Sequence, residues 1–283
     1  MAAVRQELPC AEMDYAAGTW WPTVLVVGAS RGIGLSLARL YAAENATVHA
    51  TGRLTRHGAA ATPLHDLARR HAKVALHTLD VRNDTQRRAL SAEIGRAGVD
   101  VLIYSAGVNS GDVPTQLAIN AEAPMALLPL LLPAMRRRRG RVLCLITSSM
   151  GTEAQLRRRT RLGHAQLRNY SLSKLEANRR FRALEPKWRA QGVTAVALNP
   201  GFVRTDMNKG RGKISAEASA RAIKRALSGQ PRPLLAGSFI DHLGRQLSWS
   251  SGQPLLADQL LAEPRRRSSQ HLLPPHQHQS RDG

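Results

Sequence analysis

The sequence predicts a three-layer α/β/α fold, in which helices cover both faces of one doubly wound parallel sheet in a single domain. Two observations carry this prediction. Short runs of apolar and β-branched residues alternate with segments of helical apolar spacing along most of the 283 residues. This alternation is typical of parallel βαβ units. A glycine-rich turn directly follows the first apolar run, Thr23–Val27.

The expected elements follow the chain in order. Each expected strand is a short apolar run with few polar breaks, as in strands buried on both faces. The expected strands are 23–27, 47–51, 73–79, 101–104, 141–147 and 193–198. The expected helices are 35–44, 84–96, 121–135, 169–189 and 215–227.

The composition changes at both ends of the chain. Residues 1–21 show no clear period and are expected to form an extension, with the domain spanning 22–249. The remainder, 250–283, is polar and is expected to be mostly disordered, above all over 264–283. Its three histidines are interpreted as part of a flexible tail rather than as metal ligands. They are His271, His276 and His278.

Net charge and cysteine content limit the class of protein. A charge of +21 suggests nucleic acid, but most of the basic residues are arginines without interleaved aromatic residues, so nucleic-acid binding is the less favoured interpretation. Some of the charge would suit a phosphorylated cofactor. Two cysteines, Cys10 and Cys144, form no disulfide framework, and we expect a cytoplasmic protein. No apolar run uninterrupted by proline is long enough to predict a membrane span.

The turn Gly28–Gly34 predicts a Rossmann-type dinucleotide site, because it follows a strand and opens a helix. Gly28 permits a tight turn, Gly32 lets the backbone approach a ligand, and Gly34 allows close packing of helix on strand. The N–H groups of the helix N-terminus would hold the pyrophosphate.

The end of the second strand indicates which dinucleotide is bound. An acidic residue there would accept hydrogen bonds from a free ribose 2′-hydroxyl, but Arg53 follows Thr51-Gly52, with Arg56 nearby. Arg31 in the glycine turn points to the same neighbourhood. Guanidinium groups suit a 2′-phosphate, so NADP is favoured over NAD. The alternative is that these are two of many arginines.

A hydroxyl and a Tyr/Lys pair form the expected reaction centre. Tyr170 and Lys174 are four residues apart and share one face of a helix. A neighbouring ammonium would lower the pKa of the phenol and make it a better proton donor and acceptor. Ser148 follows a buried strand, where its hydroxyl could bond a substrate carbonyl.

Together these segments resemble the short-chain dehydrogenase/reductase family, and most of all its branch of sniffer-like and C-factor-like carbonyl reductases. The resemblance covers about 23–249. It rests on the glycine turn, Asp80-Val81, Ala106-Gly107, Ile146–Gly151, Tyr170–Lys174, Asn199–Met207 and the closing segment 241–249.

The resemblance implies an NADP(H)-dependent oxidoreductase acting on a carbonyl or alcohol. Its reaction centre would be Tyr170 as proton donor, Lys174 on the nicotinamide ribose, Ser148 on the carbonyl and Asn120 positioning water for a proton relay. The cofactor would lie on Gly28, Ser30, Arg31, Gly32, Ile33, Gly34, Arg53, Asp80, Val81, Ala106, Gly107, Tyr170, Lys174, Pro200, Gly201, Val203 and Thr205.

Three departures from the family pattern bear on activity. Ser105 replaces the usual asparagine before Ala106-Gly107, and the segment between Gly107 and Asn120 is shorter, so that the helix carrying Asn120 is expected to start late. The stretch 152–168 is longer and rich in arginine. These features keep open a second hypothesis, a dinucleotide-binding regulatory protein with little turnover. Members of the family often form dimers through two of their helices, so the resemblance also implies a possible homodimer.

Overall fold

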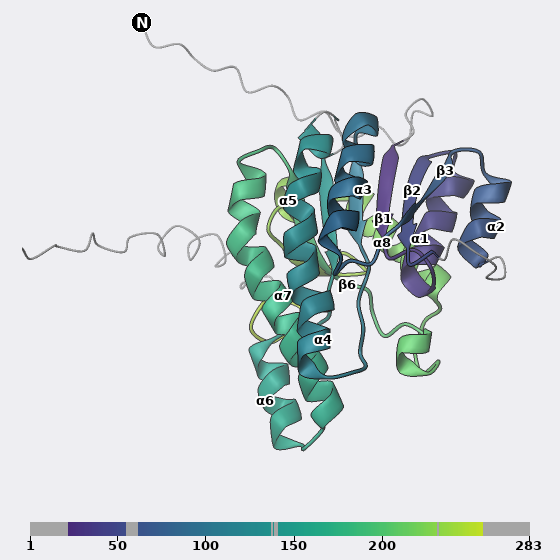
Figure 1. The fold of residues 1–283 in the computed structure, drawn as a ribbon. Coiled ribbons are helices and arrows are strands. Elements are labelled where there is room, and N and C mark those ends of the chain that lie inside the picture. The colour runs from purple at the N-terminus through teal and green to yellow at the C-terminus, as the bar shows by residue number, and fades with distance from the viewer. Residues whose placement is uncertain (1–21, 55–61, 137, 139–140, 231, 257–283) are drawn as a thin grey trace, which may run out of the picture.

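A computed structural model describes residues 22–54, 62–136, 138, 141–230 and 232–256 (Figure 1). The expected extension 1–21, Cys10, Arg56 and the tail 264–283 with its histidines lie outside these residues. Within them, the strands form one parallel sheet of order β3-β2-β1-β4-β5-β6-β7. The strands are β1 (Thr23–Val27), β2 (Thr47–Gly52), β3 (Val74–Thr78), β4 (Val101–Tyr104), β5 (Val142–Ile146), β6 (Thr194–Asn199) and β7 (Phe239–Asp241).

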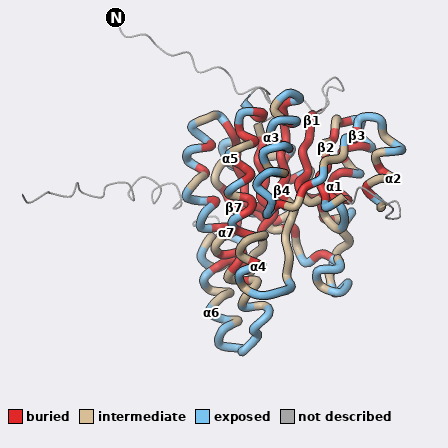
Figure 2. Tube along the Cα trace, viewed as in Figure 1, coloured by how far each residue is buried: buried red, intermediate tan, exposed pale blue. Residues whose placement is uncertain are grey.

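Helices cover both faces of this sheet. They are α1 (Gly32–Ala43), α2 (Pro63–Arg70), α3 (Asp84–Ala97), α4 (Val113–Leu117), α5 (Ala123–Arg136), α6 (Glu153–Arg161), α7 (Ala165–Arg189), α8 (Ala216–Ser228) and α9 (Arg232–Leu235). Helices α1, α2 and α8 share one apolar cluster with the sheet, and α3, α5 and α7 share the other. The three-layer single-domain fold expected from the sequence is therefore confirmed, and its buried residues run through the middle of the molecule (Figure 2).

Alternate residues of β1, β4, β5 and β6 supply the two clusters. Val24 and Val26 face one helical layer, while Leu25 and Val27 face the other. All four are fully buried, which is why the run carries no polar residue. Cys144 lies in β5 and is buried, and burial alone raises the pKa of its thiol above the usual range.

The helix that carries Asn120 differs from the expectation. We expected a helix over 121–135 with a late start, but α4, a wide turn over Ala118–Glu122 and α5 form one continuous helical segment from Val113 to Arg136. In the wide turn, the Ala123 N–H donates to the Ala118 carbonyl five residues back. Position 124 is a proline and has no N–H, so it cannot make the ordinary α-helical hydrogen bond to the carbonyl four residues back.

The same segment is long and apolar enough to span a membrane by length and composition, despite its prolines. Half of its most apolar window is buried in the molecule. Leu127, Leu128 and Leu131 of α5 belong to the cluster between this layer and the sheet. The segment is thus packed as a core helix of this domain.

The domain continues past Trp249, whose ring stacks on Phe239 at 5.0 Å between ring centroids. The Ser250 carbonyl accepts a hydrogen bond from the Ala154 N–H at the start of α6. The Leu255 N–H donates to the Gln246 carbonyl. The first bond attaches the C-terminal segment to the start of α6, and the second attaches it to the segment after β7.

Candidate active site

A cavity of about 1020 Å³ opens at the carboxyl edge of the sheet and collects residues from the loops after β1 to β6. In an open parallel sheet this edge is where ligands bind. The expected site residues that line it are Gly28, Ser30, Arg31, Gly32, Ile33, Arg53, Asp80, Val81, Ala106, Gly107, Ser148, Tyr170, Lys174, Pro200, Gly201, Val203 and Thr205. Gly34 and Asn120 do not line it and lie behind its wall.

The glycine turn is shaped by close contact. Gly28 has φ +85°, and a Cβ there would lie 2.7 Å from the Ala106 backbone in the loop after β4. A Cβ on Gly34 would lie 2.1 Å from the Gly28 carbonyl oxygen, which holds α1 tightly against the turn. The Thr51 hydroxyl accepts from the Gly28 N–H at 3.1 Å and links the turn to β2. Only glycine fits this cradle at the N-terminus of α1.

Arginines gather at the end of the cavity formed by β2 and β3. Arg31, Arg53 and Arg82 all line it. Arg82 holds Asp80 through both guanidinium and main-chain hydrogen bonds, at 2.8 Å for the shortest, and these bonds lower the pKa of the Asp80 carboxyl. Arg53 is exposed and makes no ion pair within the described part of the chain. This end of the cavity therefore offers guanidinium groups to an anion.

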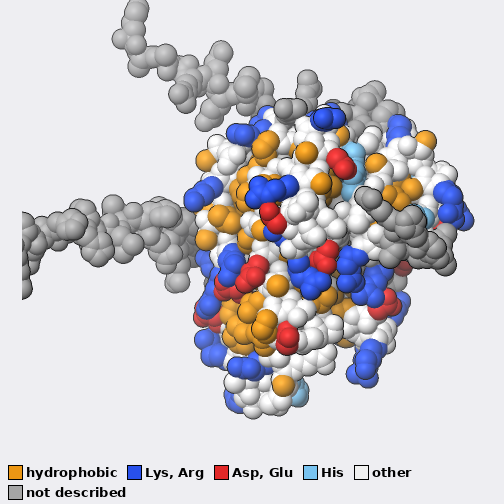
Figure 3. All heavy atoms as spheres, in the orientation of Figure 1, with side chains coloured by type: hydrophobic (Ala, Val, Ile, Leu, Met, Phe, Trp, Pro, Cys, Tyr) orange, Lys and Arg blue, Asp and Glu red, His pale blue; other side chains and the backbone are white. Residues whose placement is uncertain are grey.

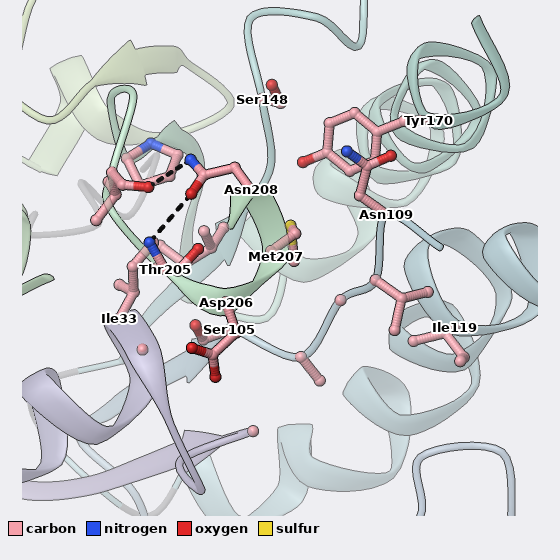
Figure 4. A pocket seen from close by; sticks show the side chains of 18 of the residues that line it. Ile33, Ser105, Asn109, Ile119, Ser148, Tyr170, Thr205, Asp206, Met207 and Asn208 are labelled. Carbon is pink, nitrogen blue, oxygen red and sulfur yellow. Dashed lines mark hydrogen bonds between the residues drawn. The ribbon is translucent and has the colours of Figure 1, made fainter. Parts of the chain in front are cut away.

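Tyr170 and Ser148 meet on the opposite side of the cavity, where Figure 4 shows the phenol oxygen turned toward the loop that carries Ser148. The Ser148 hydroxyl is placed to act on the phenol through a hydrogen bond, which favours the ionised form of Tyr170. Burial raises the pKa of Tyr170 to about 12, and the bond to Ser148 offsets only part of this rise. Burial therefore outweighs the lowering of this pKa that we expected from Lys174. In this state Tyr170 is a proton donor that stays protonated at neutral pH.

Lys174 lies one helical turn beyond Tyr170, with its Nζ 5.9 Å from the centre of the phenol ring. The side chain is 5% exposed, and burial lowers the pKa of its ammonium to about 8. Nζ donates to the Ile146 carbonyl at 3.3 Å. It also lies 3.4 Å from the position of a Cβ on Gly107. The ammonium thus faces a place where a ligand's hydroxyl groups can approach.

Asn120 acts on the site through its neighbours. Its amide nitrogen donates to the Val108 carbonyl at 2.8 Å and to the Ser173 hydroxyl at 2.9 Å, and its amide oxygen accepts from the Val108 N–H. The Ser173 hydroxyl in turn donates to the Tyr170 carbonyl. The Asn120 side chain therefore holds the loop after β4 against α7, and these bonds occupy both ends of its amide.

A residue that we did not predict holds in place the loop after β5, which carries Ser148. Asn178 donates to the Gly151 carbonyl at 2.8 Å and accepts from the Thr147 hydroxyl at 2.6 Å. A Cβ on Gly151 would lie 2.8 Å from the Lys174 carbonyl, so the loop lies directly on α7. The spacing of Tyr170, Lys174 and Asn178 by four residues places all three along one face of α7, and this signal was visible in the sequence.

The loop after β6 borders the cavity on its remaining side. Asn208 accepts from the Thr205 N–H and donates to the Val203 carbonyl, as the dashed lines in Figure 4 show. The Thr205 methyl group lies 3.4 Å from the position of a Cβ on Gly32, so this loop reaches the glycine turn. Further lining residues that we did not predict include Arg82, Asn109, Arg159, Gln166 and Leu167.

These features fit a nicotinamide dinucleotide. The glycine cradle at a helix N-terminus suits the pyrophosphate, the arginines suit a 2′-phosphate, and the buried ammonium suits ribose hydroxyls. The phenol of Tyr170 and the hydroxyl of Ser148 can share one carbonyl oxygen. Among the described residues, no group of three or more metal-ligating side chains is present.

The chain is similar in sequence to known proteins. The family model described as short chain dehydrogenase matches residues 22–215. The C-signal protein of Myxococcus xanthus is 30% identical over 172 residues, which are 57% of this chain and 99% of that protein.

Solved structures share the fold. NADPH-bound carbonyl reductase from chicken fatty liver has a TM-score of 0.72 and 25% identity, over 81% of this chain and 94% of that chain. The carbonyl reductase Sniffer of D. melanogaster has a TM-score of 0.69 and 23% identity, over 81% of this chain and all of that one, and its likeness shows the fold.

Proposed function

The chain belongs to the short chain dehydrogenase family and is similar to its sniffer-like branch, and from this premise we propose that it is an NADP(H)-dependent carbonyl reductase. The observation that carries the proposal is the meeting of Ser148, Tyr170 and Lys174 in the same cavity as the glycine turn. One relative by structure is a carbonyl reductase bound to NADPH. The reverse reaction, oxidation of an alcohol, would use the same groups.

When bound, NADPH would supply the hydride. Gly28, Gly32 and Gly34 would hold its pyrophosphate, Arg31 and Arg53 its 2′-phosphate, and Lys174 the nicotinamide ribose. Asp80 and Val81 would border its adenine, and Pro200, Gly201, Val203 and Thr205 its nicotinamide end.

The protein's own part is to position the substrate and to move one proton. Ser148 would donate a hydrogen bond to the carbonyl oxygen and orient it toward Tyr170. Tyr170 would give its hydroxyl proton to that oxygen as negative charge develops there. The buried ammonium of Lys174 would stabilise the phenolate that remains. Asn120 and Asn178 would hold the loops after β4 and β5 in place against α7.

The alternative of a regulatory protein with little turnover is not favoured. One reason for that alternative was the short segment before Asn120. The helical segment nevertheless starts at Val113, and the Asn120 amide is hydrogen-bonded to Val108 and Ser173. The insertion likewise forms α6 beside the cavity and leaves Tyr170 and Ser148 together in its lining.

The proposal is tested by following NADPH oxidation with a panel of aldehydes and ketones, with NADH in parallel. We expect turnover of at least one carbonyl class with NADPH. Tight NADPH binding without turnover of any carbonyl, or of any alcohol with NADP⁺, would contradict the proposal.

A further inference from the structure

Helix α6 carries four arginines, of which one turns toward the active site. Arg157, Arg158 and Arg161 are exposed, whereas Arg159 is half-buried and lines the cavity. The others therefore form the solvated face of α6. The insertion that departs from the family pattern thus adds one cation to the wall of the pocket.

Helix pairing places Arg159 near the reaction centre. Figure 1 shows α6 beside the first turns of α7, beyond the edge of the sheet. The two helices form a hairpin through a turn at Gly163, and an ion pair at 2.9 Å between Glu153 and Arg179 closes its base. In this antiparallel arrangement Arg159 lies level with the turn of α7 that carries Leu167 and Tyr170, and all three line the cavity.

The Arg159 guanidinium has no anionic partner within the described residues. Its Nε–H is buried and donates to no acceptor among these residues. The acids of α6 and of the cavity are engaged elsewhere: Glu153 with Arg157 and Arg179, Asp80 with Arg82, and Asp206 with Arg31. A buried charged donor without an acceptor is costly, and an anion in the cavity would remove that cost.

A second polar group in the lining of the same cavity lacks a hydrogen-bond partner among the described residues. The side-chain oxygen of Asn109 is buried without a hydrogen bond. Asn109 and Tyr170 both line the cavity, on the same side of it in Figure 4, and the main-chain carbonyl of Asn109 accepts from the Gln166 side-chain amide at 2.9 Å. Since amide oxygen and nitrogen exchange by a half-turn of the group, Asn109 can offer a donor to the same anion.

The cofactor does not account for this cation. The glycine turn that would hold the pyrophosphate opens α1, which covers the opposite face of the sheet from α7. In Figure 4, Ile33 of that turn and Tyr170 stand on opposite sides of the pocket. An anion at Arg159 would therefore belong to the substrate.

We propose that Arg159 binds an anionic group of the substrate, so that the substrates are carbonyl compounds bearing a carboxylate, that is, oxo acids. The inference rests on the proposed carbonyl reductase function and narrows its substrate class. Arg159 would select the substrate by binding its carboxylate, while Ser148 and Tyr170 would bind its carbonyl. The carboxylate of the product would be bound in the same way.

The test compares each of a series of straight-chain oxo acids with its uncharged methyl ester. The series varies the number of carbons between the carbonyl and the carboxylate. For the best chain length, we expect kcat/KM for the acid to exceed that for the ester by about tenfold or more. In Arg159→Gln this ratio should fall by about tenfold, and Arg159→Lys should restore part of it. Arg158→Gln on the exposed face is the matched control and should keep the wild-type ratio.

A second measurement does not depend on turnover. Straight-chain fatty carboxylates should bind the NADP⁺ complex, and Arg159→Gln should weaken that binding about tenfold. If esters and acids are reduced equally well and Arg159→Gln does not change the affinity for carboxylates, the inference is overturned while the reductase function stands. If carboxylates bind through Arg159 but no carbonyl is reduced, the anion site stands and the proposed function falls.

Discussion

The guanidinium of Arg31 lies 3.4 Å from the carboxylate of Asp206, so an ion pair joins the glycine turn to the loop after β6. Both side chains are more than two-thirds exposed. Arg31 is also a proposed ligand of the cofactor's 2′-phosphate. The carboxylate and the phosphate therefore compete for the same guanidinium.

This competition predicts that Asp206→Asn binds NADPH more tightly than wild type. An exposed ion pair contributes about 0–1 kcal/mol, so the gain should be at most about fivefold. NADPH fluorescence titration measures it. Glu122→Gln removes the same charge at an exposed position outside the cavity and is the control. Weaker NADPH binding in Asp206→Asn would show that Asp206 supports the cofactor site.

The arginines after β1 and β2 predict a preference for NADPH over NADH of about tenfold or more, because a charge-assisted hydrogen bond contributes about 1.5–3 kcal/mol. Arg53→Gln should reduce the preference by weakening NADPH binding, with little effect on NADH. Parallel titrations with both cofactors test this. Equal affinities of the wild type for the two cofactors would contradict the NADP assignment.

The pKa of Lys174 predicts the pH dependence of carbonyl reduction. Burial lowers this pKa to about 8, and in the proposed mechanism the ammonium form would stabilise the Tyr170 phenolate. The kcat/KM for reduction should therefore fall as the pH rises through about 8. Tyr170, with a pKa of about 12, stays protonated over this range. The residual rate of Lys174→Met should lack this fall, whereas the same pH profile in that variant would assign the titration to another group.

Two glycine substitutions should have opposite effects on stability, because Gly28 lies in the crowded glycine turn and Gly95 lies inside an ordinary helix. Gly28→Ala forces a Cβ to 2.7 Å from the Ala106 backbone at a positive φ, which should cost about 1–3 kcal/mol and weaken NADPH binding. Gly95 lies inside α3 with open space around it, so Gly95→Ala should gain about 0.5–1 kcal/mol. Thermal unfolding should show a lower Tm for the first and a higher Tm for the second. A tolerated Gly28→Ala would mean that the turn can relax.

The strands of the core were predictable because their signal is local. Runs such as Thr23–Val27 lack polar residues, since both of their faces are buried. The last strand lies at Phe239–Asp241, slightly before the closing segment expected from the resemblance. Its three residues are too few to show a periodicity.

The elements that were missed lack such an apolar signal. Helix α6 has no buried residue and is held partly by ion pairs of Glu153 with Arg157 and Arg179, so its residues carry no apolar stripe. Helix α2 starts with a Thr62-Pro63 cap, but only Leu64 and Leu67 of it are buried.

The site was predictable where a motif defines a position and not where contacts define it. The glycine turn and the Tyr/Lys pair follow from residue type and spacing. The pairing of Asp80 with Arg82, the clamp of Asn178 and the inward turn of Arg159 depend on how loops and helices pack. The pKa of Tyr170 likewise depends on burial, which opposes the expected effect of Lys174.

On the surface, basic side chains are spread among acidic and apolar ones on the face shown in Figure 3. Several arginines of the chain form local ion pairs, such as Arg88 with Asp84 and Arg180 with Glu176. Part of the positive charge of the chain thus serves helix surfaces, and part lines the cavity, at Arg31, Arg53 and Arg159.

The central claim is that Tyr170 gives its proton to a substrate carbonyl, and Tyr170→Phe tests it most directly because it removes only the hydroxyl. Acid catalysis of this kind contributes about 10²–10⁴ in rate. We expect kcat for NADPH-dependent carbonyl reduction to fall at least a hundredfold in Tyr170→Phe while its Kd for NADPH stays near that of wild type. An unchanged kcat in a variant that still binds NADPH would contradict the account.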